Sequence, residues 1–323
     1  MTQRTWFITG VNSGFGRVMT EQLLARGDRV AGTTRKMDAM DDLKEKYGNL
    51  LWLDHLDMTD TAGIQRVVRN AFADLGKIDV IVSNAGYGLF GAAEELSDEQ
   101  VTHQLSTNLI GPIMLVRAAL PHLRAQGGGR IIGLSTFGGQ AALPGGSLYH
   151  ASKWGLEGFL DSLSIELAVF KIGVTIIESG SARTNFRFGG AQLGEPMEAY
   201  KGTPAGMVHA MIKDTSRQPL GDPAKMSAVI VGSVDQEPAP KRIVLGTDSW
   251  GIIHKALTDR LAAVEAQKDL AASADIPTGA RPRSHSLPPG ISQSVTPTST
   301  MFSPRLDLER KLPSEMWRMP ITQ

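Results

Sequence analysis

The chain has 323 residues, of which 41% are apolar and 20% charged, the composition of an ordinary globular protein. Its 33 lysines and arginines balance 33 aspartates and glutamates, so overall charge does not favour nucleic acid or an anionic membrane as a partner. The absence of cysteine excludes disulfides, a thiolate nucleophile and thiolate metal sites. With no apolar run near the ~18 residues of a membrane span, and no secretory signal in the first ten residues, we expect a cytoplasmic protein.

Short β-branched runs alternate with longer segments of helical periodicity along most of the chain. Strands that alternate with helices imply right-handed βαβ units, so the expected fold is α/β with a doubly wound parallel sheet, a Rossmann fold. The predicted strands are Thr5–Thr9, Arg29–Thr34, Leu50–Leu53, Val80–Ser83, Arg130–Leu134, Val174–Glu178 and Arg242–Leu245. The predicted helices between them are Gly14–Arg26, Ala62–Leu75, Asp98–Arg124 and Leu148–Phe170.

Three later segments depart from this alternation. Residues 183–223 are rich in Gly, Pro, Phe and Met and have weak periodicity, which predicts a long functional loop. Residues 250–271 regain helical periodicity with apolar residues on one side, which predicts a terminal helix packed on the domain. The remainder, 276–323, is rich in Pro, Ser and Thr, so we expect one domain over 1–275 followed by a disordered tail.

The first strand is followed by closely spaced glycines and then by a helix. Glycine permits a tight turn and lets the backbone approach a pyrophosphate, which sits favourably at a helix N-terminus. This order of strand, glycines and helix predicts dinucleotide binding by Gly10, Asn12, Ser13, Gly14, Phe15 and Gly16.

The end of the second strand carries information on which dinucleotide binds. An acidic residue there usually holds the ribose 2′-hydroxyl of NAD. Here Thr34 is followed by Arg35 and Lys36, and an arginine accepts a 2′-phosphate through paired, charge-assisted hydrogen bonds. We therefore expect NADP(H) as the cofactor in preference to NAD(H), with Arg35 as its phosphate contact.

Two further groups lie after strands, at the edge where a doubly wound sheet presents its ligand crevice. Asp57 and Met58 follow the third strand, and Asn84, Ala85 and Gly86 follow the fourth. An aspartate there could accept a hydrogen bond from an adenine amine, and the Asn-Ala-Gly turn could place its backbone against the cofactor. We expect all five residues to contribute to cofactor binding.

The strongest constellation is Tyr149 and Lys153, four residues apart and hence on one helix face. A neighbouring ammonium favours the ionised phenol and brings its pKa toward the range of a working general acid/base. Ser135 and Thr136 end the preceding strand, and strand alternation allows only one of the two hydroxyls to face a substrate carbonyl. Asn108 lies within the long helix before that strand.

In this order, the motifs resemble the short-chain dehydrogenase/reductase family, in its single-domain subgroup. The resemblance covers about residues 3–270, and segments 8–16 and 149–158 look most like the hydroxysteroid and retinol dehydrogenase branch. The matching features are Thr9-Gly10-xxx-Gly14-x-Gly16, Asp57, Asn84-Ala85-Gly86, Asn108-xx-Gly111, the pair Ser135-Thr136, Tyr149-xxx-Lys153 and Gly180-xxx-Thr184.

The resemblance implies hydride transfer between NADP(H) and a small-molecule ketone or secondary alcohol, in a homodimer or homotetramer. Tyr149 would donate or accept the proton, Lys153 would lower the tyrosine pKa and hold the nicotinamide ribose, and Asn108 would support a water relay. Gly180 and Thr184 would lie beside the nicotinamide. The family's catalytic serine aligns with Thr136, with Ser135 one position earlier, and Ser179-Gly180 replaces the family's usual Pro-Gly.

Other functions have less support in the sequence. No Gly-x-Ser-x-Gly elbow points to a hydrolase, and the seven histidines have no metal-ligand spacing. His150 is expected on the helix surface or the rim of the site. A catalytically silent NADP(H)-binding regulator of the same fold remains the alternative. Residues of the 183–223 loop would line an apolar pocket for a lipophilic substrate, namely Phe186, Phe188, Leu193 and Met197.

Overall fold

A seven-stranded sheet, parallel throughout, forms the centre of the fold in the order β3-β2-β1-β4-β6-β7-β9. The computed structural model describes residues 3–214, 216 and 218–276, without the side chains of residues 187 and 188. The strands of the sheet are β1 (Thr5–Thr9), β2 (Arg29–Thr34), β3 (Leu51–His55), β4 (Val80–Ser83), β6 (Gly129–Thr136), β7 (Ile172–Ser179) and β9 (Arg242–Leu245). The predicted doubly wound α/β fold is confirmed.

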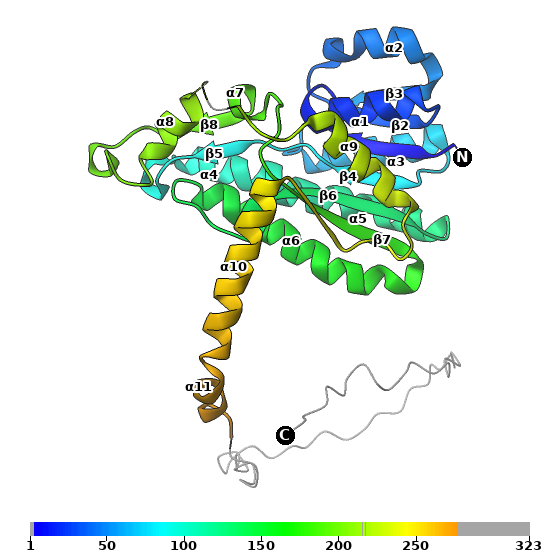
Figure 1. Cartoon of the computed structure of the whole chain (residues 1–323). Helices are drawn as coiled ribbons and strands as arrows, with labels where there is room; N and C mark the ends of the chain where they lie inside the picture. The colour runs from blue at the N-terminus through cyan, green and yellow to red at the C-terminus, as the bar shows by residue number, and fades with distance from the viewer. Residues whose placement is uncertain (1–2, 215, 217, 277–323) are drawn as a thin grey trace, which may run out of the picture. The chain divides into compact units, whose positions relative to one another are not determined.

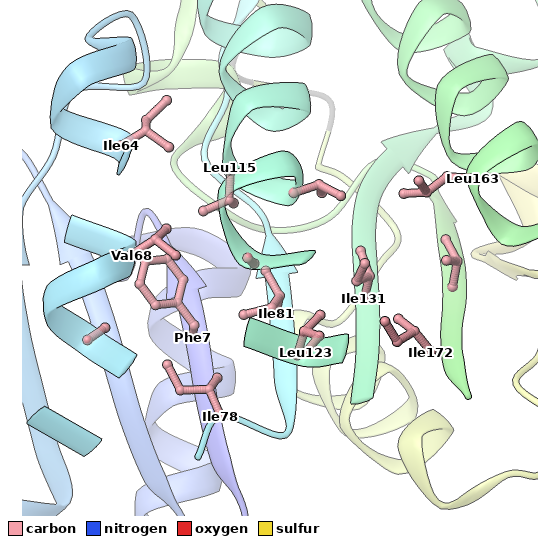
Figure 2. Packing of buried hydrophobic residues seen from close by; sticks show 14 of the residues in the cluster. Phe7, Ile64, Val68, Ile78, Ile81, Leu115, Leu123, Ile131, Leu163 and Ile172 are labelled. Carbon is pink, nitrogen blue, oxygen red and sulfur yellow. The ribbon is translucent and has the colours of Figure 1, made fainter. Parts of the chain in front are cut away.

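Helices cover both faces of this sheet (Figure 1). The main ones are α1 (Gly14–Ala25), α2 (Asp41–Tyr47), α3 (Thr61–Leu75), α4 (Asp98–Leu105), α5 (Gly111–Ala125), α6 (Ser147–Leu167) and α9 (Pro223–Gly232). Alternate residues of a strand point to opposite faces, so Phe7 packs with α3, α5 and α6 while Trp6 and Ile8 pack with α1 and α9. Figure 2 shows the first of these two cores, in which Ile81 and Ile131 also take part.

The long helix predicted over Asp98–Arg124 is interrupted. Helix α4 passes into a π-helical turn, η4 (Ser106–Ile110), before α5 begins at Gly111. Sequence periodicity does not distinguish such a turn from a regular one, because it adds only a single residue to the repeat. π-Turns are frequent at functional sites, and this one contains Asn108.

The segment predicted as an irregular loop, 183–223, contains short regular elements. They are α7 (Phe186–Gly189), β8 (Ala191–Leu193) and α8 (Met207–Lys213). Strand β8 pairs in parallel with β5 (Gly88–Phe90), which follows closely after β4. The segment is therefore attached to the body of the domain through a small second sheet.

The predicted packing of the terminal helix is wrong for most of its length. Helix α10 (Thr247–Glu265) buries Ser249 and Ile253, but Trp250, Leu261 and Val264 are 61%, 60% and 63% exposed. Figure 1 shows α10 leading away from the layers after its first turns. Helix α10 does have an apolar face, but the periodicity of the sequence does not show whether that face packs against the rest of the domain.

The short helix α11 (Lys268–Ser273) follows, and the predicted tail lies, from residue 277 onward, outside the described residues. Among the helices that the structure describes, none is long and apolar enough to cross a membrane.

Candidate active site

A cavity of about 870 Å³ opens at the carboxyl ends of the strands. Residues that follow β1, β2, β3, β4, β6 and β7 line it, and the segment after β7 closes one end. In open parallel sheets this edge is where ligands bind, at the point where the strand order reverses. In this sheet the reversal lies between β1 and β4.

The glycine turn after β1 and the turn after β4 form one hydrogen-bonded unit. The Asn84 side-chain amide donates to the carbonyl oxygens of Thr9 and Gly10, at 2.7 and 3.2 Å. The Thr9 hydroxyl oxygen accepts from the backbone amides of Asn84 and Ala85, both at 3.0 Å. A β-carbon on Gly16 would lie 2.2 Å from the Gly10 carbonyl oxygen, so only glycine fits there.

The start of α1 faces the cavity. Ser13 occupies the N-cap without a side-chain capping bond, and Gly14 has φ +56°, a left-handed conformation that favours glycine. The first amides of the helix therefore point toward the cavity, where they fit an anion. Asn12 and Phe15 also line this end, and Thr184 approaches Gly14 from the segment after β7.

Arg35 and Asp57 lie together at the far end of the cavity. The Arg35 side chain is 67% exposed, with Nη1 3.7 Å from Asp57 Oδ2. Burial raises the pKa of Asp57, but hydrogen bonds from Thr59 and the charge of Arg35 outweigh it and lower that pKa below its usual value. Lys36 and Met58 line the same end. The Arg35 guanidinium is exposed enough to contact a phosphate, although it already forms an ion pair with Asp57.

Asn108 lies behind the Asn84–Gly86 turn, outside the cavity lining. Its amide nitrogen donates to the Tyr87 carbonyl oxygen at 2.7 Å, and its Oδ1 accepts from the Tyr87 amide at 3.1 Å. A β-carbon on Gly86 would lie 3.1 Å from this Oδ1. The side chain therefore fixes the backbone that continues from the cofactor turn.

The structure separates Thr136 from Ser135, the two candidates for the substrate-binding hydroxyl. Thr136 lines the cavity, and its hydroxyl donates to the Ser179 carbonyl oxygen at 2.9 Å. Ser135 points away from the cavity and donates to the buried carboxylate of Glu157 at 2.5 Å. Strand alternation produces this division, and it leaves Thr136 as the hydroxyl in the cavity.

Tyr149 lines the cavity between two aromatic rings, with centroids 5.5 Å from Phe90 and 5.9 Å from Phe186. The Lys153 ammonium lies 6.0 Å from the centroid of the tyrosine ring and donates to the Leu134 carbonyl oxygen at 2.8 Å. Burial lowers the pKa of Lys153 to about 8, although the charge of Glu157 opposes this shift.

The expected effect of Lys153 on the tyrosine is not seen. Burial raises the pKa of Tyr149 above its usual value, and the lysine does not offset it. The reason is geometric, because the ammonium is directed at a backbone carbonyl instead of the phenol oxygen. In this arrangement Tyr149 keeps its proton at neutral pH and is suited to act as an acid.

The expectation that His150 lies on the helix surface is wrong, although the residue does border the cavity. Its side chain is buried, with Nδ1 3.1 Å from the Gly138 carbonyl oxygen and Nε2 accepting from the Leu143 amide at 3.2 Å. Because Nε2 accepts, Nδ1 carries the proton and donates. His150 thereby fixes both ends of the loop between β6 and α6, which borders the cavity.

Sequence reasoning missed several residues that hold the site together. Asp248, in the first turn of α10, accepts from the Ser181 amide and hydroxyl at 2.8 and 2.6 Å. A β-carbon on Gly180 would lie 2.0 Å from its carboxylate, so glycine is needed there. Glu157 was detectable in principle, since it lies four residues after Lys153 on the same helix face.

Glu95 is a second missed carboxylate, and it anchors the segment after β7. It is buried and accepts from the Met197 amide at 3.0 Å and from the His209 ring at 2.8 Å. Of the four residues expected to line an apolar pocket, Phe186 does so, whereas Leu193 and Met197 lie outside the lining. The side chain of the fourth, Phe188, lies outside the described part of the structure.

Residues 4–189 match the short chain dehydrogenase family. The chain belongs to this family. A structure of a short-chain dehydrogenase from Streptomyces avermitilis is 36% identical, with a TM-score of 0.79 over 85% of this chain and 99% of that one. The oxidoreductase BOA17 of Botryotinia fuckeliana is 31% identical over 254 residues, 78% of this short-chain dehydrogenase and 92% of the relative.

A serine dehydrogenase solved in a closed form with NADP+ is 26% identical to this short-chain dehydrogenase. Its TM-score is 0.62, over 75% of this chain and 93% of the other. Together these likenesses identify the protein as an oxidoreductase with the fold of a nicotinamide-dinucleotide enzyme.

Proposed function

We propose that this short-chain dehydrogenase interconverts a lipophilic ketone and its secondary alcohol with NADP(H), Tyr149 serving as the general acid/base. The observation that carries the proposal is one continuous cavity whose lining includes both the glycine turn after β1 and the phenol of Tyr149. The open N-terminus of α1 and the close backbone approach at Gly16 fit a dinucleotide there. A bound nicotinamide supplies or accepts the hydride.

The protein's own residues supply the proton and the polar contacts. Tyr149, held protonated by burial, donates its proton to the carbonyl oxygen during reduction and takes it back during oxidation. The Thr136 hydroxyl turns from the Ser179 carbonyl to donate to the same oxygen. Lys153 and the backbone held by Asn108 and Asn84 position the cofactor beside them. Gly180, with Thr184, forms the neighbouring wall.

The choice between the two hydroxyls is testable by paired substitutions. Thr136→Val keeps the shape but removes the hydroxyl, and we expect kcat/KM to fall by roughly 10²-fold, the loss of one oxyanion donor. Ser135→Ala leaves the cavity unchanged and is expected to lower kcat/KM by less than about tenfold, because it removes one indirect hydrogen bond. Steady-state kinetics of both variants, with Thr136→Ser as the control that restores activity, measure this. The reverse ranking would assign the role to Ser135.

Preference for NADP(H) is proposed on Arg35 and Lys36, which line the cavity where NAD enzymes carry an acidic residue. NADP+ in the similar serine dehydrogenase adds support. We expect Arg35→Ala to raise the KM for NADPH by roughly 10–100-fold, the value of a charge-assisted pair. The KM for NADH should change little. Equal effects on both cofactors would show that Arg35 is only a surface charge.

The substrate end of the cavity supports a lipophilic compound. The apolar residues Phe90, Leu143, Phe186, Val208 and Met211 line it, although polar side chains such as Asn185 and Gln192 are also present in the lining. The direct test is a panel of aromatic ketones, diketones and sterols, followed by loss of reduced-nicotinamide absorbance with NADPH and with NADH. Turnover of small charged hydroxy acids, with none of lipophilic ketones, would contradict the substrate class.

We further place the enzyme in the cytoplasm as a homodimer or homotetramer. Its lack of cysteine and balanced charge support the first statement. Exposed apolar side chains at Trp154 and Ile165 of α6, and at Val169 in the short turn that follows it, support pairing of that helix between subunits. Light scattering of the purified protein gives the solution mass that decides it.

A further inference from the structure

Behind the cavity, charged side chains from three elements meet in a cluster that is buried at its two glutamates and partly exposed elsewhere. Its members are Glu157 and Asp161 of α6, Glu178 of β7, and Lys241 and Arg242 at the start of β9. The Arg242 guanidinium donates to all three carboxylates. Glu157 and Glu178 lie deepest, each with its side chain only 2% exposed. We call these five residues the α6 charge cluster.

Glu157 also reaches the segment that presents Thr136 to the cavity. Its Oε1 accepts from the Ser135 hydroxyl at 2.5 Å, and its Oε2 accepts from the side-chain amide of Gln140. A β-carbon on Gly139 would lie 1.9 Å from Oε1, so the turn after β6 is wrapped closely around the carboxylate. One side chain therefore fixes the chain on both sides of Thr136.

Lys153 lies one helical turn before Glu157, on the same face of α6. Burial lowers the pKa of Lys153 to about 8, and the charge of Glu157 acts in the opposite direction. Removing that charge would release the lysine proton at a lower pH. The other titratable groups around this part of α6 are Tyr149, His150, Asp161, Glu178, Lys241 and Arg242.

We infer that Glu157 is a positioning residue for the proposed hydride transfer, acting through Lys153 and Thr136 without contacting the substrate. It holds the lysine in its charged form and fixes the strand end that carries the threonine. The inference rests on the proposed function for its effect on turnover. The link between Glu157 and Lys153 rests on their spacing of four residues on one face of α6, whereas the link to Thr136 rests on the hydrogen bonds from Ser135 and Gln140 to the Glu157 carboxylate.

The alkaline limb of the kcat profile tests the inference, because the proposed function requires Lys153 as a cation and we therefore expect activity to fall as the lysine loses its proton. In Glu157→Gln we expect this limb to move to lower pH by about half a unit or more, as expected for loss of a nearby opposite charge. Asp161→Asn is the matched control, since it also removes a carboxylate bound to Arg242 but lies two turns from Lys153. An unmoved limb in Glu157→Gln, or an equal movement in Asp161→Asn, would overturn the inference.

A variant with the opposite sign covers the case in which Glu157→Gln does not fold. Arg242→Gln removes the cation that opposes Glu157, so the alkaline limb is expected to move to higher pH. An alkaline limb of the kcat profile that stays in place or moves to lower pH in Arg242→Gln would contradict the role of Glu157. A purely structural contact would lower kcat in either variant without moving the limb in opposite directions.

Urea unfolding between pH 7 and 11 gives a readout independent of turnover. Lys153 binds fewer protons in the folded than in the unfolded chain between its two pKa values, so stability rises with pH in that window. The window starts near pH 8 in the wild type and should start lower in Glu157→Gln. When Lys153→Met is present in both proteins, the wild type and Glu157→Gln should no longer differ in how their stability depends on pH. If the difference in stability persists without Lys153, Glu157 does not act through Lys153, and this holds even where ketone reduction by the wild type is observed.

Discussion

Tyr149→Phe is expected to abolish ketone reduction while leaving the fold and cofactor binding intact. The substitution removes only the phenol oxygen, and the ring keeps its contacts with Phe90 and Phe186. Loss of a positioned general acid lowers kcat by about 10²–10⁴-fold. Burial keeps the wild-type phenol of Tyr149 protonated, so it is the proton donor that the substitution removes.

Stopped-flow or steady-state rates with a ketone from the active panel measure the loss, and quenching of protein fluorescence by NADPH measures binding. Thermal unfolding serves as the control for the fold. Wild-type-like turnover in Tyr149→Phe would refute the mechanism. Cofactor binding without turnover of any ketone by the wild type would favour the silent regulator instead.

Lys153→Met is expected to make the protein much less active and more stable. Burial lowers the pKa of Lys153 from 10.5 to about 8, so at pH 7 the folded chain carries the cost of keeping an ammonium in a buried site. At about 1.4 kcal/mol per pKa unit this cost is roughly 3 kcal/mol. Loss of the hydrogen bond from Lys153 to the Leu134 carbonyl destabilises the variant by about 1 kcal/mol and so offsets part of this gain. We therefore expect the free energy of unfolding to rise by about 2 kcal/mol at pH 7.

The sign of this effect depends on pH. The cost is fully present below pH 8 and disappears as pH rises through 10.5, where the unfolded lysine also loses its proton. The stability gain in Lys153→Met should vanish in the same range, and kcat should fall by about 10²–10³-fold at pH 7. Urea titrations at several pH values measure the gain. A destabilised variant at pH 7 would show that Lys153 is held favourably in the fold.

Local patterns predicted much of the fold. The bounds of β1, β2, β4 and β9 coincide with the predicted runs, because parallel strands are rich in apolar and β-branched residues and are ended by polar or glycine residues. The glycine turn and the two side chains Tyr149 and Lys153 also meet at one edge of the sheet as expected, although Lys153 lies behind the cavity lining. Each of these depends on residues close together in sequence.

Contacts between residues far apart in the chain could not be predicted from the sequence. Nothing local shows that Lys153 turns to the Leu134 carbonyl, that His150 is buried, or that Asp248 supports the turn at Gly180. The outward course of α10 has the same origin, since an apolar helix face does not specify what covers it. Tertiary geometry decides such pairings, and it also decides the sign of a pKa shift, as it does for Tyr149.

The pairing of β5 with β8 attaches to the domain a segment that forms one end of the cavity, while the sheet itself forms the other. The ends of the sheet strands form the cofactor end of the cavity, whereas the segment after β7 contributes much of the substrate end and joins the domain through contacts that include the pairing of β8 with β5 and the Glu95 anchor. Apart from Phe186, whose ring contacts Tyr149, changes at the lining residues of this segment are therefore expected to alter the shape of the substrate end without disturbing the glycine turn. Selection for a new substrate can act on this segment alone, and a library confined to it is the economical route to altered specificity.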